Sequence, residues 1–212
     1  MAQETTTVSF ERALPSSPAK MTYEAFLARA DEDTWAEWVD GEVLVLMSAS
    51  AEHQDLADFL TALLRFFTEA HQSGTVRSAP FQMKTGPDLP GREPDILFVA
   101  REHLDRLKHV YLDGPADLVV EIVSPESRSR DRGTKFYEYE QGGVREYWLL
   151  DPVRRQAEFY GLGADGIYRF LEVDRNGIIR SLVLQGLWIN VAWLWQEPLP
   201  PLLHILREWG LV

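Results

Sequence analysis

Short apolar runs bounded by turn-forming residues dominate the middle of the chain. Residues 95–100 read Asp-Ile-Leu-Phe-Val-Ala, and residues 118–123 read Leu-Val-Val-Glu-Ile-Val. Both runs are rich in β-branched residues and have proline or glycine nearby, which predicts two buried strands. Each run carries one carboxylate, Asp95 in the first and Glu121 in the second.

The flanking pattern predicts helices and a hairpin around these strands. Apolar residues recur every three or four positions over Glu52–His71, which is typical of an amphipathic helix. Asp40-Gly41 lies between two apolar runs and predicts a tight hairpin, because glycine tolerates the positive φ that such a turn needs. The other expected elements are, in chain order, a short N-capped helix from Thr22 to Leu27, a strand over Thr75–Met83, a short helix around Arg101–His109, a helix over Arg132–Gln141, a strand over Glu146–Asp151, and a β-meander formed by Gln156–Tyr160, Ile167–Val173 and Ile178–Leu182.

This order of elements favours an α/β fold with one domain. We expect residues 21–212 to form a central mixed β-sheet flanked by helices, with an N-terminal β-hairpin and a C-terminal β-meander. Residues 1–20 are polar, contain prolines and lack periodicity, so we expect them to form an N-terminal arm.

Composition limits the chemistry. The chain has 212 residues and no cysteine, which excludes disulfides, iron–sulfur clusters and zinc ribbons. A metal would need oxygen and imidazole ligands, which favours Mg²⁺, Ca²⁺ or Mn²⁺. No apolar run is long enough to span a membrane, and the N-terminus lacks a signal-peptide pattern, so we expect a cytoplasmic protein without a membrane partner.

The acidic charge is unevenly distributed. The formal net charge is −12, but residues 84–135 hold 9 Lys/Arg against 10 Asp/Glu, a net charge of −1. Tight non-specific binding of nucleic acid needs a basic surface, which the chain as a whole lacks. A local basic groove remains open, and its candidate residues are Arg128, Arg130, Arg132 and Lys135.

The two strand carboxylates suggest a reaction centre. A carboxylate inside a buried strand is costly unless something pairs with it, and two on neighbouring strands repel unless a cation lies between them. Lys135 follows Glu121 by fourteen positions, at the start of a predicted helix. Two carboxylates, an ammonium group and a metal together indicate a hydrolytic site.

The order of these pieces resembles the PD-(D/E)xK nuclease core, and the fuller pattern is similar to the Uma2 family of restriction-endonuclease-like proteins. The resemblance covers roughly residues 20–195. Its matching pieces are Val39-Asp-Gly-Glu42, a helix with His53 near its start, Pro94-Asp95-Ile96, Val120-Glu-Ile-Val-Ser-Pro125, Asp131, Lys135, Tyr139, Gly143-Val-Arg-Glu-Tyr-Trp148 and Asp151-Pro152. One departure matters, because the written motif would place lysine at position 123, where this chain has valine. The resemblance implies that Lys135 on the following helix takes that role.

The resemblance implies a Mg²⁺-dependent endodeoxyribonuclease, with Mn²⁺ as a possible substitute. Asp95 and Glu121 would hold the metal, with the Ile122 carbonyl as a further ligand, and Lys135 would orient the attacking water. Glu42 would complete the acidic cluster. His53 would contact the metal, the phosphate or a site carboxylate. DNA is the implied substrate, and a homo-oligomer is expected because such enzymes must address two strands.

Less specific interpretations stay open at this point. Asp95 could cap a turn, and Lys135 could be an exposed helix lysine. A non-catalytic interaction module with the same fold would also fit the acidic charge. A glycosidase pair made of Asp95 and Glu121 would need no metal and would leave Lys135 unused. No glycine-rich phosphate loop occurs, so no nucleotide cofactor is expected.

Overall fold

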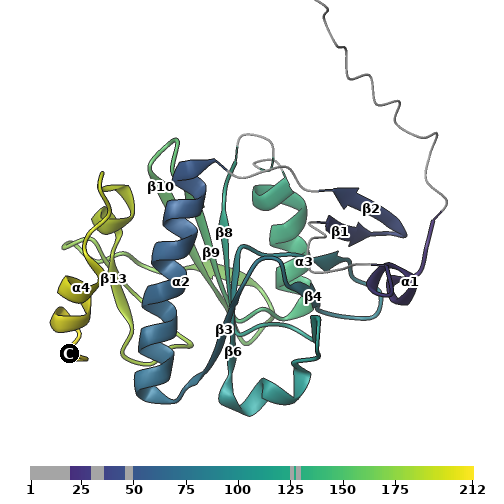
Figure 1. Ribbon diagram of the computed structural model, residues 1–212, viewed down its shortest axis with the longest axis horizontal. Coiled ribbons are helices and arrows are strands. Elements are labelled where there is room, and N and C mark those ends of the chain that lie inside the picture. The colour runs from purple at the N-terminus through teal and green to yellow at the C-terminus, as the bar shows by residue number, and fades with distance from the viewer. Residues whose placement is uncertain (1–19, 30–35, 46–49, 125–126, 128–129) are drawn as a thin grey trace, which may run out of the picture.

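The computed structural model describes residues 20–29, 36–45, 50–124, 127 and 130–212 (Figure 1). Most of the expected N-terminal arm therefore lies outside the described residues. The elements are, in chain order, α1 (Tyr23–Leu27), β1 (Ala36–Val39), β2 (Glu42–Val45), α2 (Ala51–His71), β3 (Gly74–Ser78), β4 (Gln82–Lys84), β5 (Gly91–Arg92), β6 (Ile96–Ala100), η1 (Arg101–Arg106), β7 (Tyr111–Asp113), β8 (Leu118–Ile122), η2 (Arg130–Thr134), α3 (Lys135–Gly142), β9 (Glu146–Asp151), β10 (Gln156–Leu162), β11 (Tyr168–Phe170), β12 (Ile178–Arg180), β13 (Trp188–Asn190), η3 (Val191–Trp195) and α4 (Leu202–Glu208).

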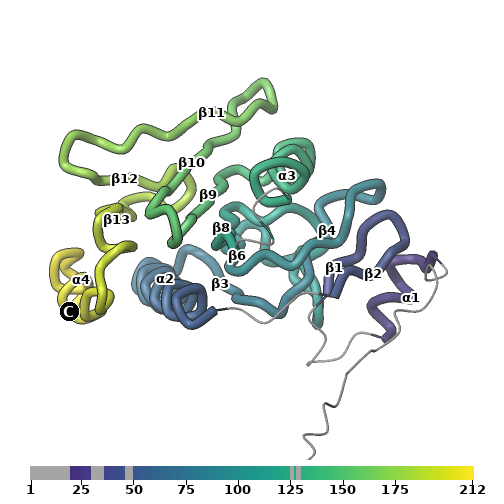
Figure 2. The backbone as a smooth tube through the Cα atoms, turned by 90° about the horizontal axis from the view of Figure 1, so that it is seen from above, coloured from purple at the N-terminus to yellow at the C-terminus, as the bar shows by residue number. Residues whose placement is uncertain are grey.

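A six-stranded mixed sheet forms the centre, in the order β11-β10-β9-β8-β6-β3. Strands β8 and β9 are parallel, and the other neighbours are antiparallel. Helix α2 lies on one side of this sheet and α3 on the other, as Figure 2 shows. This confirms the expected α/β fold with a mixed sheet flanked by helices.

Alternation along β8 decides which helix each side chain meets. Leu118, Val120 and Ile122 pack into the apolar cluster that contains α2, and Val119 packs into the cluster that contains residues of α3. Successive side chains of a strand point to opposite faces, so Glu121 shares the α3 face with Val119. The carboxylate thus enters the layer between the sheet and α3.

A second sheet, in the order β2-β1-β5-β4-β7, carries the predicted hairpin. Strands β1 and β2 pair around Asp40 and Gly41, whose φ angles are 50° and 88°. Both values lie in the left-handed region that a two-residue hairpin turn requires, which is why this dipeptide predicted the turn correctly. The hairpin lies beside α1 at one end of the molecule (Figure 1).

Two expected strands are corrected by the structure. The predicted strand Thr75–Met83 is two strands, β3 in the central sheet and β4 in the second sheet. Pro80 lies between them and lacks the N–H that a continuous ladder needs. The third strand of the predicted meander, β12, leaves β11 and pairs with β13 in a separate two-stranded sheet.

The helices follow their sequence signals closely. Ser50 caps α2 by accepting a hydrogen bond from the His53 amide, and Thr22 caps α1 in the same way. The expected helix Arg132–Gln141 is the α-helix α3, preceded by the π-helical turn η2. Among the described residues, no helix is long and apolar enough to cross a membrane.

Candidate active site

The neighbouring strands β6 and β8 bring Asp95 and Glu121 to the same edge of the sheet. Their register pairs Ile96 with Val120, so Asp95 and Glu121 follow as the next residues along the two strands. The Asp95 carboxylate accepts a hydrogen bond from the Ile122 amide, with 2.6 Å between Oδ2 and the nitrogen. The predicted neighbourhood of these two carboxylates is therefore present.

His53 reaches Asp95 from the first turn of α2. Its Nε2 lies 3.2 Å from Asp95 Oδ1, and the two side chains are 16% and 20% exposed. Burial lowers the pKa of His53, but the hydrogen bond and charge of Asp95 outweigh it, so the pKa is raised above its usual range. Of the three partners proposed for His53, the structure shows the carboxylate.

Glu121 is buried and held by two donors from α3. Lys135 Nζ lies 2.9 Å from both Glu121 oxygens, and the Tyr139 hydroxyl donates to Oε1 at 2.6 Å. Burial raises the pKa of Tyr139 well above its usual value, and Glu121 adds to the effect, so Tyr139 stays a donor. Lys135 lies one helical turn before Tyr139, so both side chains project from the same face of α3.

The Lys135 ammonium contacts two further carboxylates that the sequence did not assign to the site. Glu37 Oε1 lies 2.9 Å from Nζ, and Asp131 Oδ1 lies 3.5 Å away. All three carboxylates and the lysine are nearly fully buried. We call Glu37, Asp95, Glu121, Asp131 and Lys135 the acidic cluster.

Glu37 takes the place in the acidic cluster that we expected for Glu42. Glu42 is exposed on β2 and pairs across the hairpin with Val39. Within the part of the chain that the structure describes, it makes no hydrogen bond or ion pair to the acidic cluster. Glu37 is fully buried on β1, where it also accepts a hydrogen bond from Arg92 at 2.8 Å.

Arg92 ties the second sheet to α3 through this cluster. Its guanidinium donates to both carboxylate oxygens of Glu138 at 2.7 Å, in addition to Glu37. The side chain is 3% exposed. A bidentate arginine–carboxylate pair fixes geometry as well as charge, so Arg92 holds β1 and β5 against α3.

The arginines that were candidates for a basic groove are engaged within the protein. Arg130 Nε lies 3.9 Å from Glu37, and Arg132 forms a close ion pair with Glu158. Their side chains are 31% and 29% exposed. Arg128 lies outside the described residues.

Burial and charge act in opposite directions on the acidic cluster. Burial raises the pKa of Glu121 to about 8, with Lys135 opposing the shift and Asp131 and Asp95 adding to it. Burial alone would lower the pKa of Lys135, but Glu121, Glu37 and Asp131 raise it, so the ammonium stays charged. The cluster therefore holds more carboxylates than its one lysine can neutralise.

The donor chemistry of this cluster suits a magnesium ion. Mg²⁺ in proteins is commonly held by one or two carboxylates and completes its shell with water and substrate phosphate. Asp95 and Glu121 supply two carboxylates on adjacent strands, and the Ile122 carbonyl lies beside them in the chain. No group of three or more histidine, aspartate or glutamate side chains among the described residues converges on one point in a way that could hold an ion. The residues thus fit a magnesium shared with substrate rather than a cage of protein ligands.

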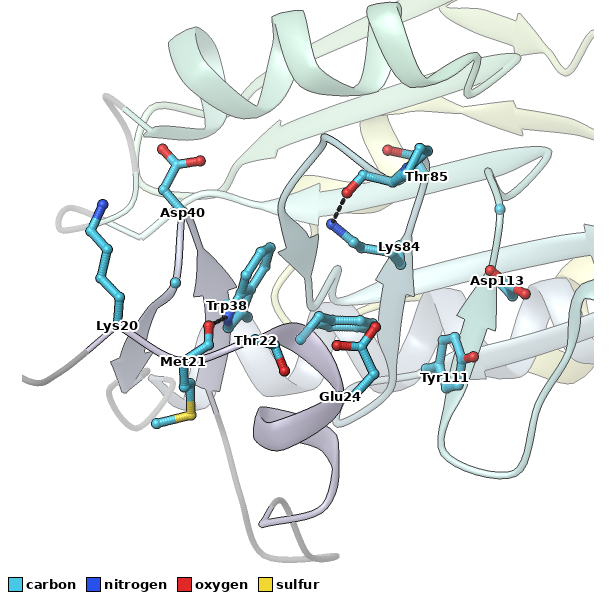
Figure 3. Close-up of a pocket in the computed structure, with 15 residues that line it drawn as sticks. Lys20, Met21, Thr22, Glu24, Trp38, Asp40, Lys84, Thr85, Tyr111 and Asp113 are labelled. Carbon is cyan, nitrogen blue, oxygen red and sulfur yellow. Dashed lines mark hydrogen bonds between the residues drawn. The ribbon is translucent and has the colours of Figure 1, made fainter.

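A separate cavity of about 870 Å³ is lined by residues of α1, β1, β4 and β7 (Figure 3). Trp38, the neighbour of Glu37, lines it together with the buried Lys84. Lys84 Nζ lies 4.6 Å from the centre of the Trp38 ring and donates to the Pro87 carbonyl at 3.1 Å. Strand residues alternate in direction, so Trp38 and Glu37 face opposite sides of β1. Lys84 lies on the Trp38 side and therefore apart from the acidic cluster.

Comparisons with known proteins agree with the fold. A solved structure described as "a putative nuclease belonging to DUF820" from Anabaena variabilis ATCC 29413 superposes with a TM-score of 0.67 and 13% identity. The match covers 82% of this chain and 97% of the other. No curated protein matches the chain.

The Uma2 family model, described as "Putative restriction endonuclease", matches residues 23–192. This match includes every residue of the acidic cluster and His53. The chain belongs to the Uma2 family of restriction-endonuclease-like proteins.

Proposed function

We propose that the protein is a metal-dependent endonuclease that hydrolyses DNA phosphodiester bonds at the acidic cluster. The observation that carries this proposal is the buried Lys135–Glu121 pair beside Asp95, on adjacent strands of a nuclease-like fold. Burying the Glu121 carboxylate and the Lys135 ammonium costs free energy that apolar side chains would not, and such buried charged groups are frequent at functional sites.

Asp95 and Glu121 would hold the Mg²⁺ ion, with the Ile122 carbonyl as a further ligand. The bound metal would lower the pKa of a water molecule and polarise the scissile phosphate. Asp95 is prepared for this role because the Ile122 amide fixes one of its oxygens and His53 contacts the other. His53 is therefore a positioning residue for Asp95.

Lys135 would orient the attacking water and offset negative charge as the phosphate reacts. A fixed ammonium in a water-poor site stabilises developing anionic charge more strongly than one in bulk water. Tyr139 would position Glu121 by its hydrogen bond to Oε1, while Oε2 accepts a hydrogen bond from Lys135.

The charge of the chain favours a second candidate, a non-catalytic interaction module. The net charge of −12 opposes DNA binding, and the described arginines near the site are paired internally. A glycosidase is disfavoured, because it would leave Lys135 unused and the structure shows Lys135 on both oxygens of Glu121.

Nicking of supercoiled plasmid separates the nuclease from the interaction module. The wild type, Asp95→Asn, Glu121→Gln and Lys135→Met are incubated with plasmid in Mg²⁺, in Mn²⁺ and in EDTA. Asp58→Asn serves as the control, because it removes an exposed carboxylate of α2 that lies outside the acidic cluster. We expect metal-dependent nicking by the wild type and the control and at least a hundredfold slower nicking by the three site variants. Folded wild-type protein that leaves plasmid intact in both metals would favour the interaction module.

A further inference from the structure

Carboxylate oxygens of three residues surround the Lys135 ammonium. Its side chain is 3% exposed, and Nζ lies 2.9 Å from both Glu121 oxygens, 2.9 Å from Glu37 Oε1 and 3.5 Å from Asp131 Oδ1. An ammonium group has three donors and no acceptor. Four carboxylate oxygens thus surround an ammonium with three donors, and a water molecule or a phosphate would have to compete with them.

Both oxygens of Glu121 accept hydrogen bonds from within the protein. Lys135 contacts both of its oxygens, and Tyr139 donates to Oε1. A divalent cation seated on Glu121 would meet the ammonium at the same two oxygens. Two cations so close repel strongly at the low effective dielectric of a buried site.

We propose that Lys135 is a built-in counter-ion of the acidic cluster and competes with a divalent cation for Glu121. This inference rests on the proposed function, in which Glu121 is a metal ligand. It assigns the lysine a second role, because the same ammonium neutralises Glu121 and has donors free for water or substrate once a cation displaces it from Glu121.

Glu37 and Asp131 give the ammonium somewhere to remain when it leaves Glu121. Both already contact Nζ, and Arg92 holds Glu37 in place at 2.8 Å. Lys135 therefore needs no new carboxylate to balance its charge. In this proposal Glu37 and Asp131 hold the Lys135 ammonium after a cation displaces it from Glu121.

His53 contacts one oxygen of Asp95, the other carboxylate assigned to the metal. Its Nε2 lies 3.2 Å from Asp95 Oδ1. Both carboxylates assigned to the metal are thus in contact with a basic side chain of the protein itself. The competition is tested on Lys135, because it is the more deeply buried of the two and contacts both oxygens of its carboxylate.

The test measures Mn²⁺ affinity by calorimetry in Lys135→Met and in the wild type. Methionine keeps the length and apolar stem of lysine and removes the charge. Lys84→Met is the matched control, because Lys84 is 8% exposed and buried in the cavity on the other side of β1. Both variants lose one buried positive charge, so a general effect of net charge changes both alike.

We expect Lys135→Met to bind Mn²⁺ at least tenfold more tightly than the wild type, which corresponds to about 1.4 kcal/mol. Lys84→Met should bind with the affinity of the wild type. Equal or weaker binding by Lys135→Met would overturn the competition, and so would equal strengthening in both variants.

Stability supplies a second readout if Lys135→Met folds poorly. Its cluster then contains buried carboxylates without their lysine, and Mn²⁺ should restore folding after dilution from urea. Lys135→Gln, which keeps two N–H donors without charge, repeats the test in a milder form. Failure of Mn²⁺ to restore either variant, with the wild type folding normally, would also overturn the competition.

The outcomes keep this inference separate from the proposed function. Wild-type protein that binds Mn²⁺ without nicking DNA would refute the nuclease, while the affinity ratio would still decide the competition. Binding by Lys135→Met alone would support the competition and contradict a metal-dependent wild-type enzyme. Absence of Mn²⁺ binding in both proteins would overturn the competition.

Discussion

Replacing Glu37 by glutamine tests the architecture of the acidic cluster. The substitution keeps the size of the side chain and removes one buried charge. Glu37 is fully buried and accepts charge-assisted contacts from Arg92 at 2.8 Å and Lys135 at 2.9 Å. Hydrogen bonds to charged groups contribute about 1.5–3 kcal/mol each, and the amide of glutamine retains part of that.

The expected loss in the free energy of unfolding is about 2–3 kcal/mol. Removing one partner of an isolated buried pair costs about 3–5 kcal/mol because the other charge is left uncompensated. Here Lys135 keeps Glu121 and Asp131, and Arg92 keeps Glu138, so the loss falls below that range. The assay is urea denaturation followed by circular dichroism, with the free energy taken from the midpoint and slope.

Glu42→Gln is the matched control for this prediction. Glu42 is the exposed glutamate of the same hairpin, and its substitution should change stability by less than about 0.5 kcal/mol. Equal losses in the two variants, or a larger loss in Glu42→Gln, would refute the assignment of Glu37 to the cluster.

The pH dependence of the Glu37 effect has a defined sign. Burial raises the pKa of Glu37, but Lys135 and Arg92 outweigh it, so the pKa lies below its usual value of 4.5. A carboxylate whose pKa is lower in the folded state stabilises the fold above its unfolded pKa, and this contribution disappears as the pH falls through the folded value. The difference between wild type and Glu37→Gln should therefore be complete at pH 7 and shrink below about pH 4.

Two further substitutions test individual contacts. Tyr139→Phe removes the 2.6 Å hydrogen bond to Glu121 and should lower the free energy of unfolding by about 1–2 kcal/mol. Variant protein that remains folded at the assay temperature should also nick plasmid more slowly. Unchanged stability and nicking would refute a positioning role for Tyr139. Gly74→Ala would place a Cβ 2.1 Å from the Val99 carbonyl oxygen at a φ of 156°. Thermal denaturation should therefore show that the free energy of unfolding falls by about 1–3 kcal/mol or more. Gly133→Ala is the control, because its Cβ would meet nothing within 4 Å, and equal melting of the two alanine variants would contradict the steric argument.

The pairing of the two site strands could be predicted from the sequence because each strand carries its own local signal. The apolar runs around Asp95 and Glu121 are buried on both faces, and buried strands that follow one another in the chain often lie side by side. Lys135 could be placed only through the family resemblance, since one lysine at the start of a helix is ordinarily exposed. The structure shows it buried at 3% exposure.

Glu37 could not be found in the same way, because its burial comes from elements distant in the chain. Along β1 it alternates with Ala36 and Trp38, a pattern that ordinarily indicates an outward-facing polar residue. Arg92 on β5 and Lys135 on α3 cover that face, and neither contact leaves a trace in the local sequence. The expectation for Glu42 followed the hairpin signal, which fixed the turn correctly and carried no information about which glutamate is buried.

The most direct test of a metal site at Asp95 and Glu121 is a calorimetric titration of Mn²⁺ into the wild type and Glu121→Gln. Glutamine retains the shape of the side chain and removes the charge that a cation requires. We expect Mn²⁺ to bind at the acidic cluster of the wild type and of the Asp58→Asn control, and we expect Glu121→Gln to lose that binding. Undiminished binding by Glu121→Gln, or no binding by folded wild-type protein at millimolar Mn²⁺, would contradict this expectation.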